Sequence, residues 1–264
     1  MVIKKDIHKV ENNPFVDVIM PNYNKGKFLE ESINSVISQE YEYWKLYIID
    51  NFSTDESQKI LKKYKNIKKD INLIFLSKNK GVSFSRNFGI RLSNSKYISF
   101  LDSDDYWSKD KLKDQINFME KNNYVFTYTD YIPFILKNDK NFFKKDIIVP
   151  NSFNFNHFIT DTSISTSTMI IQRSIIKTTK FPKIKTLEDY AFKCQLLKNG
   201  NQAIKFNQSS AYYRILKNSL SSNKLKSLYW LWCINKKYNK LSFIYRLKSA
   251  LLIIISSMKK YAFK

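Results

Sequence analysis

Glycine, histidine and cysteine are scarce in this 264-residue chain, and each shortage excludes a class of site. The four glycines fit neither the G-x-G-x-x-G pattern of a dinucleotide site nor the G-x-x-x-x-G-K-[ST] phosphate loop. Two histidines, His8 and His157, leave almost no basis for a histidine triad or a zinc site. Cys194 and Cys233 cannot build a disulfide framework and belong to no metal-ligand cluster. Any catalysis must therefore use carboxylates.

Long apolar runs are also missing. The stretch from Met1 to Val18 is charged and lacks the apolar core of a signal peptide. No run reaches the ~18–20 apolar residues that cross a bilayer, and the longest candidate, Ala250–Ile255, is far shorter. We therefore expect a cytoplasmic protein, with peripheral contact to the inner face of the cell membrane as an extension of that expectation.

Acidic residues are few beside basic ones: 23 Asp and Glu against 45 Lys and Arg, a formal net charge of +22. A charge of this size attracts nucleic acid, an acidic membrane surface or phosphorylated substrates. A lysine-rich surface that faces only solvent would give the same net charge. Hydrophobic residues make up 43% of the chain and aromatic residues 16%, so the chain is a folded protein and not a disordered polymer.

Strand-like runs alternate with helical stretches in the first half of the chain. Runs rich in Val, Ile, Tyr and Phe predict strands at Val16–Met20, Leu46–Ile49, Leu73–Leu76, Tyr97–Leu101 and Tyr124–Tyr128. Helical spacing predicts helices at Phe28–Gln39, Asp55–Tyr64, Ser83–Leu92 and Asp110–Lys121. Ser53 and Glu56 match a capping box for the second of these helices. The alternation predicts an α/β fold, a mostly parallel sheet flanked on both faces by helices.

The pattern loosens after Tyr128. Residues 132–160 are predicted to be irregular. Beyond them, the pattern predicts a strand at Thr166–Gln172, a helix at Leu187–Lys198 and a strand at Tyr212–Leu216. From Lys224 onward aromatic and aliphatic residues are interleaved with lysines, which suits either an interfacial helix on an anionic leaflet or a helical cap packed on the rest of the protein.

Polar clusters follow three of the predicted strands: Pro21–Asn24, Asp50-Asn51 and Asp102–Asp105. Ligands of open parallel sheets collect beyond the carboxyl ends of the strands, so these clusters are expected at one edge. If Asp102 to Asp104 is extended, the two carboxylates point the same way and can address one Mg²⁺ or Mn²⁺ ion. By itself a D-x-D pattern is weak evidence, because acidic turns are common.

In this order and spacing the segments resemble the family 2 glycosyltransferases, which have a GT-A fold. The matching segments are Val18–Asn24, Ile48–Asp55, Asn79–Val82, Ser85–Gly89, Phe100–Asp105, Glu188–Tyr190 and Tyr213-Arg214. The resemblance implies a catalytic domain over residues 14–222, with a nucleotide-binding half to about residue 130 and an acceptor half over 131–222. A basic amphipathic helical tail over 223–264 would follow.

The resemblance also implies an activity: inverting transfer of a sugar from a nucleotide-diphosphate donor, expected to be a UDP-sugar, to an acceptor hydroxyl in the synthesis of surface or envelope polysaccharide or lipid-linked glycan. Asp189 would be the general base. Asp104 and Asp102 would hold a divalent Mg²⁺ or Mn²⁺ ion. The donor would be bound by Pro21, Tyr23, Asp50, Asn51, Arg86, Asp102, Ser103 and Asp104.

Two positions depart from the family pattern. Asn51 stands where the second residue of an Asp-Asp pair is usual, which leaves the identity of the base open. Leu216 stands where family members often have histidine two residues after the arginine, here Arg214, which leaves the acceptor-side role of this stretch open.

Each assignment has an ordinary structural alternative. Tyr23 fits a core aromatic, Asp50 a turn cap and Arg86 the partner of a surface carboxylate. Glu188-Asp189 also fits the acidic first turn of a helix.

Two other functions compete with glycosyl transfer. A sugar nucleotidyltransferase shares the topology and metal chemistry, but would be expected to show a glycine-rich loop where Pro21–Lys25 stands. A non-catalytic basic polyanion- or membrane-binding protein would explain the charge, with lysines on one face and binding that falls steeply with salt. The Asp102–Asp105 cluster would repel phosphates unless a metal intervened, so we do not expect nucleic acid as a partner.

Overall fold

The computed structural model describes residues 14–65, 67, 70–216 and 224–261. Its strands are β1 Val16–Asn22, β2 Trp44–Asp50, β3 Ile71–Phe75, β4 Tyr97–Phe100, β5 Tyr106–Trp107, β6 Phe126–Lys137, β7 Lys140–Phe143, β8 Ser152–Phe153, β9 Ile170–Gln172 and β10 Ala203–Arg214. Within the described residues they form one mixed sheet of ten strands in the order β3-β2-β1-β4-β9-β6-β10-β5. Strand β7 is added to β6, and β8 to β10.

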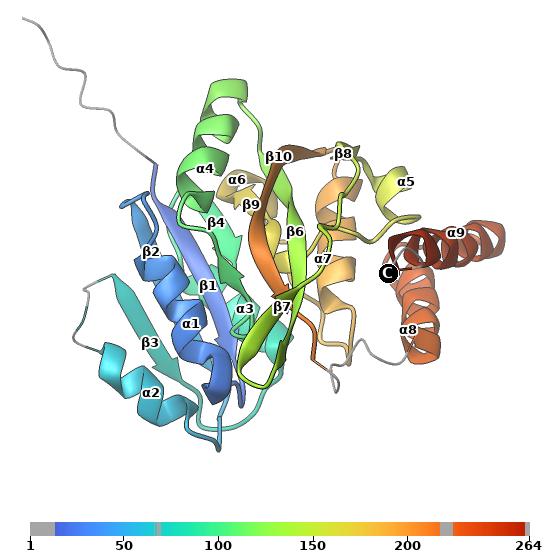
Figure 1. Ribbon diagram of the computed structural model, residues 1–264. Helices are drawn as coiled ribbons and strands as arrows, with labels where there is room; N and C mark the ends of the chain where they lie inside the picture. Colours follow the sequence, from blue (N-terminus) through green and yellow to red (C-terminus); the bar gives the residue numbers. More distant parts are fainter. Residues whose placement is uncertain (1–13, 66, 68–69, 217–223, 262–264) are drawn as a thin grey trace, which may run out of the picture.

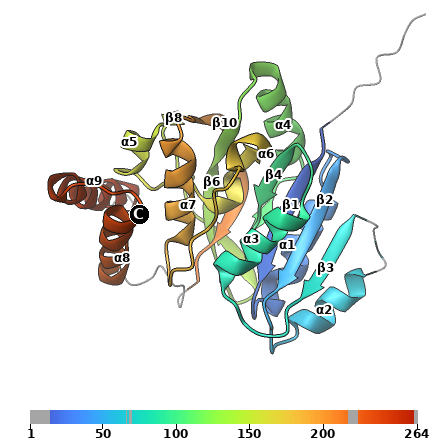
Figure 2. The same ribbon diagram turned by 180° about the vertical axis from the view of Figure 1, so that it is seen from behind.

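Helices cover both faces of this sheet. They are α1 Gly26–Ile37, α2 Ser57–Tyr64, α3 Val82–Leu92, α4 Lys111–Asn122, α5 Phe155–Phe158, α6 Arg173–Ile176, α7 Glu188–Lys198, α8 Lys224–Lys237 and α9 Phe243–Tyr261. Helix α1 lies in front of β1 and β2 (Figure 1), and α3 covers the opposite face (Figure 2). The predicted α/β architecture of a sheet between helices is confirmed.

The centre of the sheet positions the polar strand ends. All seven residues of β1 are buried, and β1 pairs in parallel with β2 on one side and β4 on the other. The register places Asn22 opposite Asp50 at the carboxyl ends of β1 and β2. Helix α3 packs closely because it presents Gly89 to the sheet: an added Cβ would lie 2.6 Å from Cγ2 of Ile19. The first two polar clusters are thus brought together by strand pairing alone.

Several boundaries predicted from the sequence are wrong. Residues 132–160 are not irregular throughout, because β6 continues to Lys137 and forms a hairpin with β7. Strand β10 begins at Ala203, and Thr166–Thr168 is a 3₁₀ turn that precedes the short β9. These strands are stabilised by pairing with β6, a long-range contact that local residue preferences do not encode.

The two C-terminal helices α8 and α9 pack on the rest of the protein through a small polar core. The Tyr190 hydroxyl donates to Oδ1 of Asn235 at 2.8 Å, and Asn235 Nδ2 donates to Oγ of Ser249 at 2.9 Å. Ser249 in turn donates to the carbonyl of Ile159 at 2.5 Å. The helix pair α8–α9 therefore packs on the rest of the protein as a helical cap, which is one of the two alternatives expected for this segment. Among the described residues no helix has the length and apolar character to span a membrane.

Candidate active site

The ends of β1 and β2 are tied together by three polar side chains. Asn22 Nδ2 donates to Oδ1 of Asp50 at 2.8 Å and to Oγ of Ser53 at 3.2 Å. The Ser53 hydroxyl donates to the same Asp50 oxygen at 2.5 Å, and its backbone N–H donates to Oδ2 at 3.1 Å. Asp50 thus caps the turn that follows β2. The predicted capping box is wrong: Ser53 is turned toward Asp50, and α2 begins at Ser57 with Glu56 at its N-cap, whose side chain forms no cap bond. The backbone N–H of Ser57 donates instead to Oδ1 of Asp55 at 3.0 Å.

Asn51 joins the loop that follows β3. Its Nδ2 donates to Oδ1 of Asn79 at 2.9 Å, and its Oδ1 accepts from the backbone N–H of Lys80 at 2.8 Å. An aspartate at position 51 could accept from Lys80 but could not donate to Asn79. The side-chain amide of Asn51, which departs from the family pattern, therefore fits the hydrogen-bond acceptor and donor that the loop after β3 offers.

Tyr23 and Pro21 lie at the same edge in different environments. Pro21 is buried within β1, whereas Tyr23 follows the strand and is 45% exposed. The core-aromatic alternative for Tyr23 is wrong. An exposed phenol ring beyond the strand end is available for stacking on a planar ligand.

The segment Asp102–Asp105 is a turn, not an extended strand end. The backbone N–H of Asp105 donates to the carbonyl of Asp102 at 2.9 Å. The prediction that alternation points Asp102 and Asp104 the same way is wrong, because a turn removes the two-residue periodicity. Asp104 meets the ammonium of Lys25 at 2.6 Å. Burial raises the pKa of Asp104; Lys25 opposes this rise and the charge of Asp102 adds to it.

Buried side chains support the Asp102–Asp105 turn. Ser103 is buried at its centre, and Asp105 accepts from the Ser167 hydroxyl at 2.7 Å and from the backbone N–H of Arg214 at 2.9 Å. The Arg214 guanidinium donates to the carbonyl of Asp104 at 2.8 Å and to the carboxylate of Glu31. Burial raises the pKa of Asp105 well above its ordinary value. Asp105 and Arg214 thus anchor the turn that displays Asp102 and Asp104.

Arg86, on α3, lies between the Asp102–Asp105 turn and the first turn of α7. Its Nη2 donates to Asp102 and its Nη1 donates to Glu188, each at 2.7 Å. The guanidinium side chain is only 5% exposed, so the surface-pair alternative is wrong. Burial raises the pKa of Glu188, and the positive charge of Arg86 opposes that rise. This buried ion triad connects α3, the Asp102–Asp105 turn and the first turn of α7.

Asp189 follows Glu188 in the first turn of α7 and keeps a partly exposed carboxylate. Its Oδ2 accepts from the Lys193 ammonium at 2.7 Å and from the Thr166 hydroxyl at 3.1 Å. Burial opposes ionisation, but Lys193 and Arg86 outweigh it, and the pKa of Asp189 falls well below its usual range. The carboxylate is therefore ionised at neutral pH and oriented by two donors.

The residues present offer a divalent cation two carboxylates, and a bound diphosphate would add further ligands. Asp102 and Asp104 each engage one carboxylate oxygen in an ion pair, and no group of three His, Cys, Asp or Glu residues forms a metal cluster within the described chain. Magnesium and manganese are commonly bound by one or two carboxylates together with substrate phosphates. The second oxygens of Asp102 and Asp104 fit that role, so the donor set agrees with a metal that arrives with a diphosphate.

Several residues of this site were missed in the sequence. Lys25, Ser53 and Asn79 lie in loops, and nothing in their local pattern indicates a partner 28 to 79 residues away. Lys193 could have been found, because it stands four residues after Asp189 in a predicted helix and i,i+4 side chains of opposite charge meet on a helix face.

Known proteins share both this sequence pattern and this fold. The model of "Glycosyl transferase family 2" matches residues 17–179. The chain belongs to that family. A relative in Escherichia coli, the UDP-Glc:alpha-D-GlcNAc-diphosphoundecaprenol beta-1,3-glucosyltransferase WfgD, is 32% identical over 251 residues, which cover 94% of this chain and 95% of the relative.

Solved structures of two other proteins have a similar fold. The S. aureus TarS 1-349 complex with UDP-GlcNAc has a TM-score of 0.70 at 19% identity, and the match covers 93% of this chain and 73% of TarS. The mannosyltransferase PcManGT from Pyrobaculum calidifontis, in complex with GDP-Man and Mn²⁺, has a TM-score of 0.69 at 14% identity, with 92% and 70% covered. The fold is GT-A, and the family assignment makes the protein a glycosyltransferase.

Proposed function

We propose that this family 2 glycosyltransferase moves a sugar, with inversion, from a UDP-sugar to a hydroxyl of a lipid-linked or envelope glycan. The observation that carries the proposal is the ion triad of Arg86, Asp102 and Glu188, which links the donor-side turn to the helix turn that holds Asp189. The UDP-GlcNAc complex of TarS and the diphosphoundecaprenol substrate of WfgD support the choice of donor and acceptor class.

The donor half would bind the nucleotide between Tyr23 and the amide pair Asn51–Asn79. The exposed Tyr23 ring supplies a stacking surface, and the amides supply donors and acceptors for a base edge. Buried Asp50 acts mainly through the turn it caps, with Pro21 and Ser103 as buried supports. This division of roles follows from exposure. Tyr23 and Asn79 are exposed, whereas Asn51 is buried and would act through the Asn79 amide that it holds.

The negative charge that develops on the leaving diphosphate must be compensated, and Asp102 and Asp104 would hold the metal ion that does so. Mg²⁺ or Mn²⁺ held by these carboxylates would neutralise the leaving group. Arg86 keeps Asp102 in place, and the Lys25 ammonium, on leaving Asp104, would face the same diphosphate. Two positively charged side chains of the protein, Arg86 and Lys25, therefore contact the two carboxylates of this turn.

Asp189 would accept the proton of the attacking hydroxyl. Its carboxylate is ionised, 29% exposed and held by Lys193 and Thr166 with one oxygen, Oδ1, left for the acceptor. A positioned carboxylate base typically contributes 10²–10⁴-fold to rate. The low pKa keeps Asp189 unprotonated over the whole neutral range.

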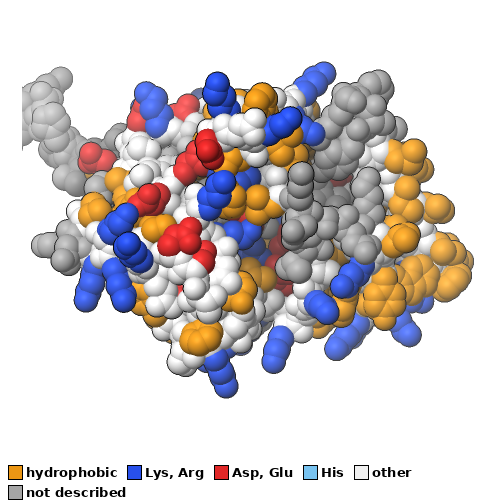
Figure 3. Space-filling view, turned by 60° about the horizontal axis from the view of Figure 1, so that its bottom comes forward, with side chains coloured by type: hydrophobic (Ala, Val, Ile, Leu, Met, Phe, Trp, Pro, Cys, Tyr) orange, Lys and Arg blue, Asp and Glu red, His pale blue; other side chains and the backbone are white. Residues whose placement is uncertain are grey.

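Membrane contact is proposed for the outer face of the helix pair α8–α9. Large apolar side chains are exposed there, among them Leu225 at 82%, Ile244 at 75% and Met258 at 64%. Figure 3 shows hydrophobic side chains, in orange, gathered at the end of the molecule that carries α8 and α9, with lysines and arginines beside them. Apolar side chains flanked by basic ones suit the interface of an anionic leaflet, with ~1 kcal/mol for each basic residue near the surface.

The donor site is tested by thermal unfolding of the purified protein with UDP, GDP or dTDP, each with and without Mn²⁺. We expect UDP with Mn²⁺ to raise the unfolding temperature most, because a ligand that binds only the native state stabilises it. No shift with any nucleotide would remove the proposed donor site. A second assay, flotation with anionic liposomes of wild type against a chain ending at Ser222, tests the membrane contact; equal flotation would remove it.

A further inference from the structure

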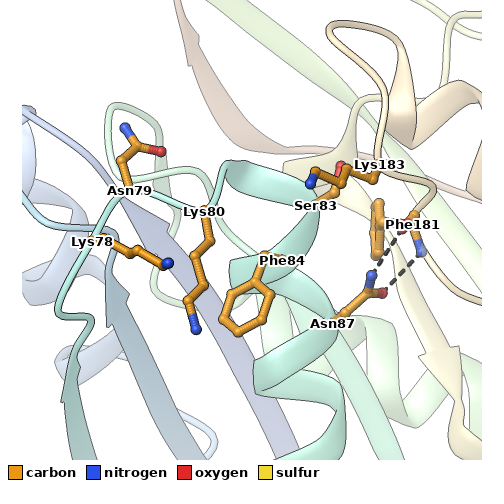
Figure 4. Close-up of a pocket in the computed structure, with 8 residues that line it drawn as sticks. All are labelled: Lys78, Asn79, Lys80, Ser83, Phe84, Asn87, Phe181 and Lys183. Carbon is orange, nitrogen blue, oxygen red and sulfur yellow. Dashed lines mark hydrogen bonds between the residues drawn. The ribbon is translucent and has the colours of Figure 1, made fainter.

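A basic pocket lies beside the donor loop, apart from the carboxylates of the site. It has a volume of about 430 Å³. Its lining consists of three lysines, two phenylalanines and three small polar residues: Lys78, Lys80, Lys183, Phe84, Phe181, Asn79, Ser83 and Asn87. Figure 4 shows Lys78 and Lys80 on the loop after β3, with Lys183 on the opposite wall beyond α3. Its lining includes no carboxylate.

The two walls of the pocket are joined rigidly. Asn87 Nδ2 donates to the carbonyl of Phe181 at 2.8 Å, and the Phe181 backbone N–H donates back to Oδ1 of Asn87 at 2.9 Å. The Ser83 hydroxyl donates to the carbonyl of Pro182 at 2.8 Å. These three bonds, of which Figure 4 shows the two between Asn87 and Phe181, fasten residues 181–182 to α3 next to Lys183.

The charge in the pocket is uncompensated within the part of the chain that the structure describes. None of Lys78, Lys80 and Lys183 forms an ion pair there; Lys80 only places its ammonium 4.4 Å from the ring centre of Phe84. Helix α3 begins at the pocket with Gly81 at its N-cap and no acidic residue in its first turn. The positive end of the helix dipole therefore adds to three ammonium groups.

The position of the pocket connects the two halves of the site. The loop with Lys80 binds Asn51 of the donor side, and the segment with Lys183 leads five residues later into Glu188 and Asp189. The pocket is thus bordered by a loop that contacts Asn51 and by the segment that precedes α7. Three ammonium groups match the charge of a diphosphate better than that of a single carboxylate or phosphodiester, and Phe84 offers an apolar face for the adjoining sugar or lipid.

We infer that the pocket of Lys78, Lys80 and Lys183 is a phosphate-binding subsite for a phosphate-bearing acceptor, separate from the site of the donor diphosphate. Naming the ligand an acceptor rests on the proposed glycosyl transfer; the anion site itself does not. The subsite would hold the acceptor's diphosphate while its hydroxyl approaches Asp189.

The test compares wild type with the double variant Lys78→Gln/Lys183→Gln by isothermal titration. Inorganic pyrophosphate is the probe, in EDTA, since without metal the Asp102–Asp104 turn repels it. The matched control is Lys59→Gln/Lys121→Gln, which removes two exposed lysines of α2 and α4. We expect the pocket variant to bind pyrophosphate about tenfold more weakly, equal to ~1.4 kcal/mol, and the control to match wild type. Equal affinity in all three proteins would overturn the inference.

Two further titrations separate the sources of the diphosphate. UDP with Mg²⁺ should bind the pocket variant as it binds wild type; a parallel loss would show that the pocket is part of the donor site and overturn the separate subsite. Farnesyl diphosphate should bind the pocket variant more weakly than wild type, as pyrophosphate does. Unchanged affinity for farnesyl diphosphate would overturn the assignment to a lipid-linked acceptor. Failure of UDP to bind any of the proteins would count against the proposed function, while the pyrophosphate comparison would still decide the pocket.

Discussion

The ammonium of Lys25 lies 2.6 Å from Oδ2 of Asp104 and joins the start of α1 to the Asp102–Asp105 turn. The positively charged ammonium of Lys25 competes with any divalent ion for the carboxylate of Asp104. The side chain of Asp104 is 19% exposed, so the ion pair is shielded in part from solvent. Lys25 is therefore both a neighbour of the proposed diphosphate and a competitor for its metal.

Replacing Lys25 by methionine keeps the side-chain length and removes the competitor. We expect Lys25→Met to lower the Mn²⁺ concentration for half-saturation about fivefold, for an ion pair of ~1 kcal/mol, as measured by titration calorimetry without nucleotide. Lys27→Met is the control, since Lys27 meets Asp139 only at 3.9 Å with both groups exposed. An unchanged midpoint in Lys25→Met would show that Asp104 does not hold the metal.

Removing the charge of Asp189 should stop transfer and spare donor binding. We expect Asp189→Asn to lower kcat by about 10²-fold or more, because the base no longer accepts a proton, with the UDP dissociation constant unchanged. The comparison variant is Asp114→Asn on α4, outside the site. Wild-type turnover in Asp189→Asn would refute the base assignment.

The dependence of activity on pH should follow Lys193. Its ammonium lowers the pKa of Asp189, so the wild-type carboxylate stays ionised far into the acid range. In Lys193→Met the pKa of Asp189 rises, and the acid limb of the kcat profile should move to higher pH. The lowered pKa also stabilises the fold above the unfolded pKa of ~3.9, a contribution lost as pH falls through the folded value. An unmoved acid limb would mean that a group other than Asp189 titrates there.

Arg86 should be the most costly charge to remove. Arg86→Met leaves Asp102 and Glu188 without their shared partner, and breaking a buried ion pair in this way destabilises by about 3–5 kcal/mol. Urea unfolding measures the change. Lys63→Met, which breaks an exposed pair with Glu30, should cost at most ~1 kcal/mol. Similar losses in the two variants would contradict a structural role for the triad.

Two glycine substitutions test the packing of α3 on the sheet. In Gly89→Ala the new Cβ would lie 2.6 Å from Cγ2 of Ile19 and 3.2 Å from Cδ1 of Ile49, and overpacking of this kind costs about 1–3 kcal/mol. In Gly26→Ala the new Cβ meets only the flexible side chain of Glu56, so thermal unfolding should show little loss. Equal stability of the two variants would contradict the close approach at Gly89.

The sequence by itself determined the α/β alternation and most elements of the first half. It also determined the family, because short motifs at the strand ends occur in a fixed order. These features are local: hydrophobic periodicity selects helix or strand, and a strand end is marked by the polar residues that follow it. The turn at Asp102–Asp105 shows the limit, because the D-x-D spacing is compatible with an extended chain and with a turn.

Only the tertiary structure decided the partners of the charged residues. Arg86 could meet many carboxylates, and it meets Glu188, 102 residues away, because α3 and α7 lie on the same face of the sheet (Figure 2). Lys78 and Lys183 line one pocket for the same reason. Side-chain preferences extend over a few residues, whereas these contacts arise from strand order and helix packing, which bring distant segments together only when the whole sheet has formed.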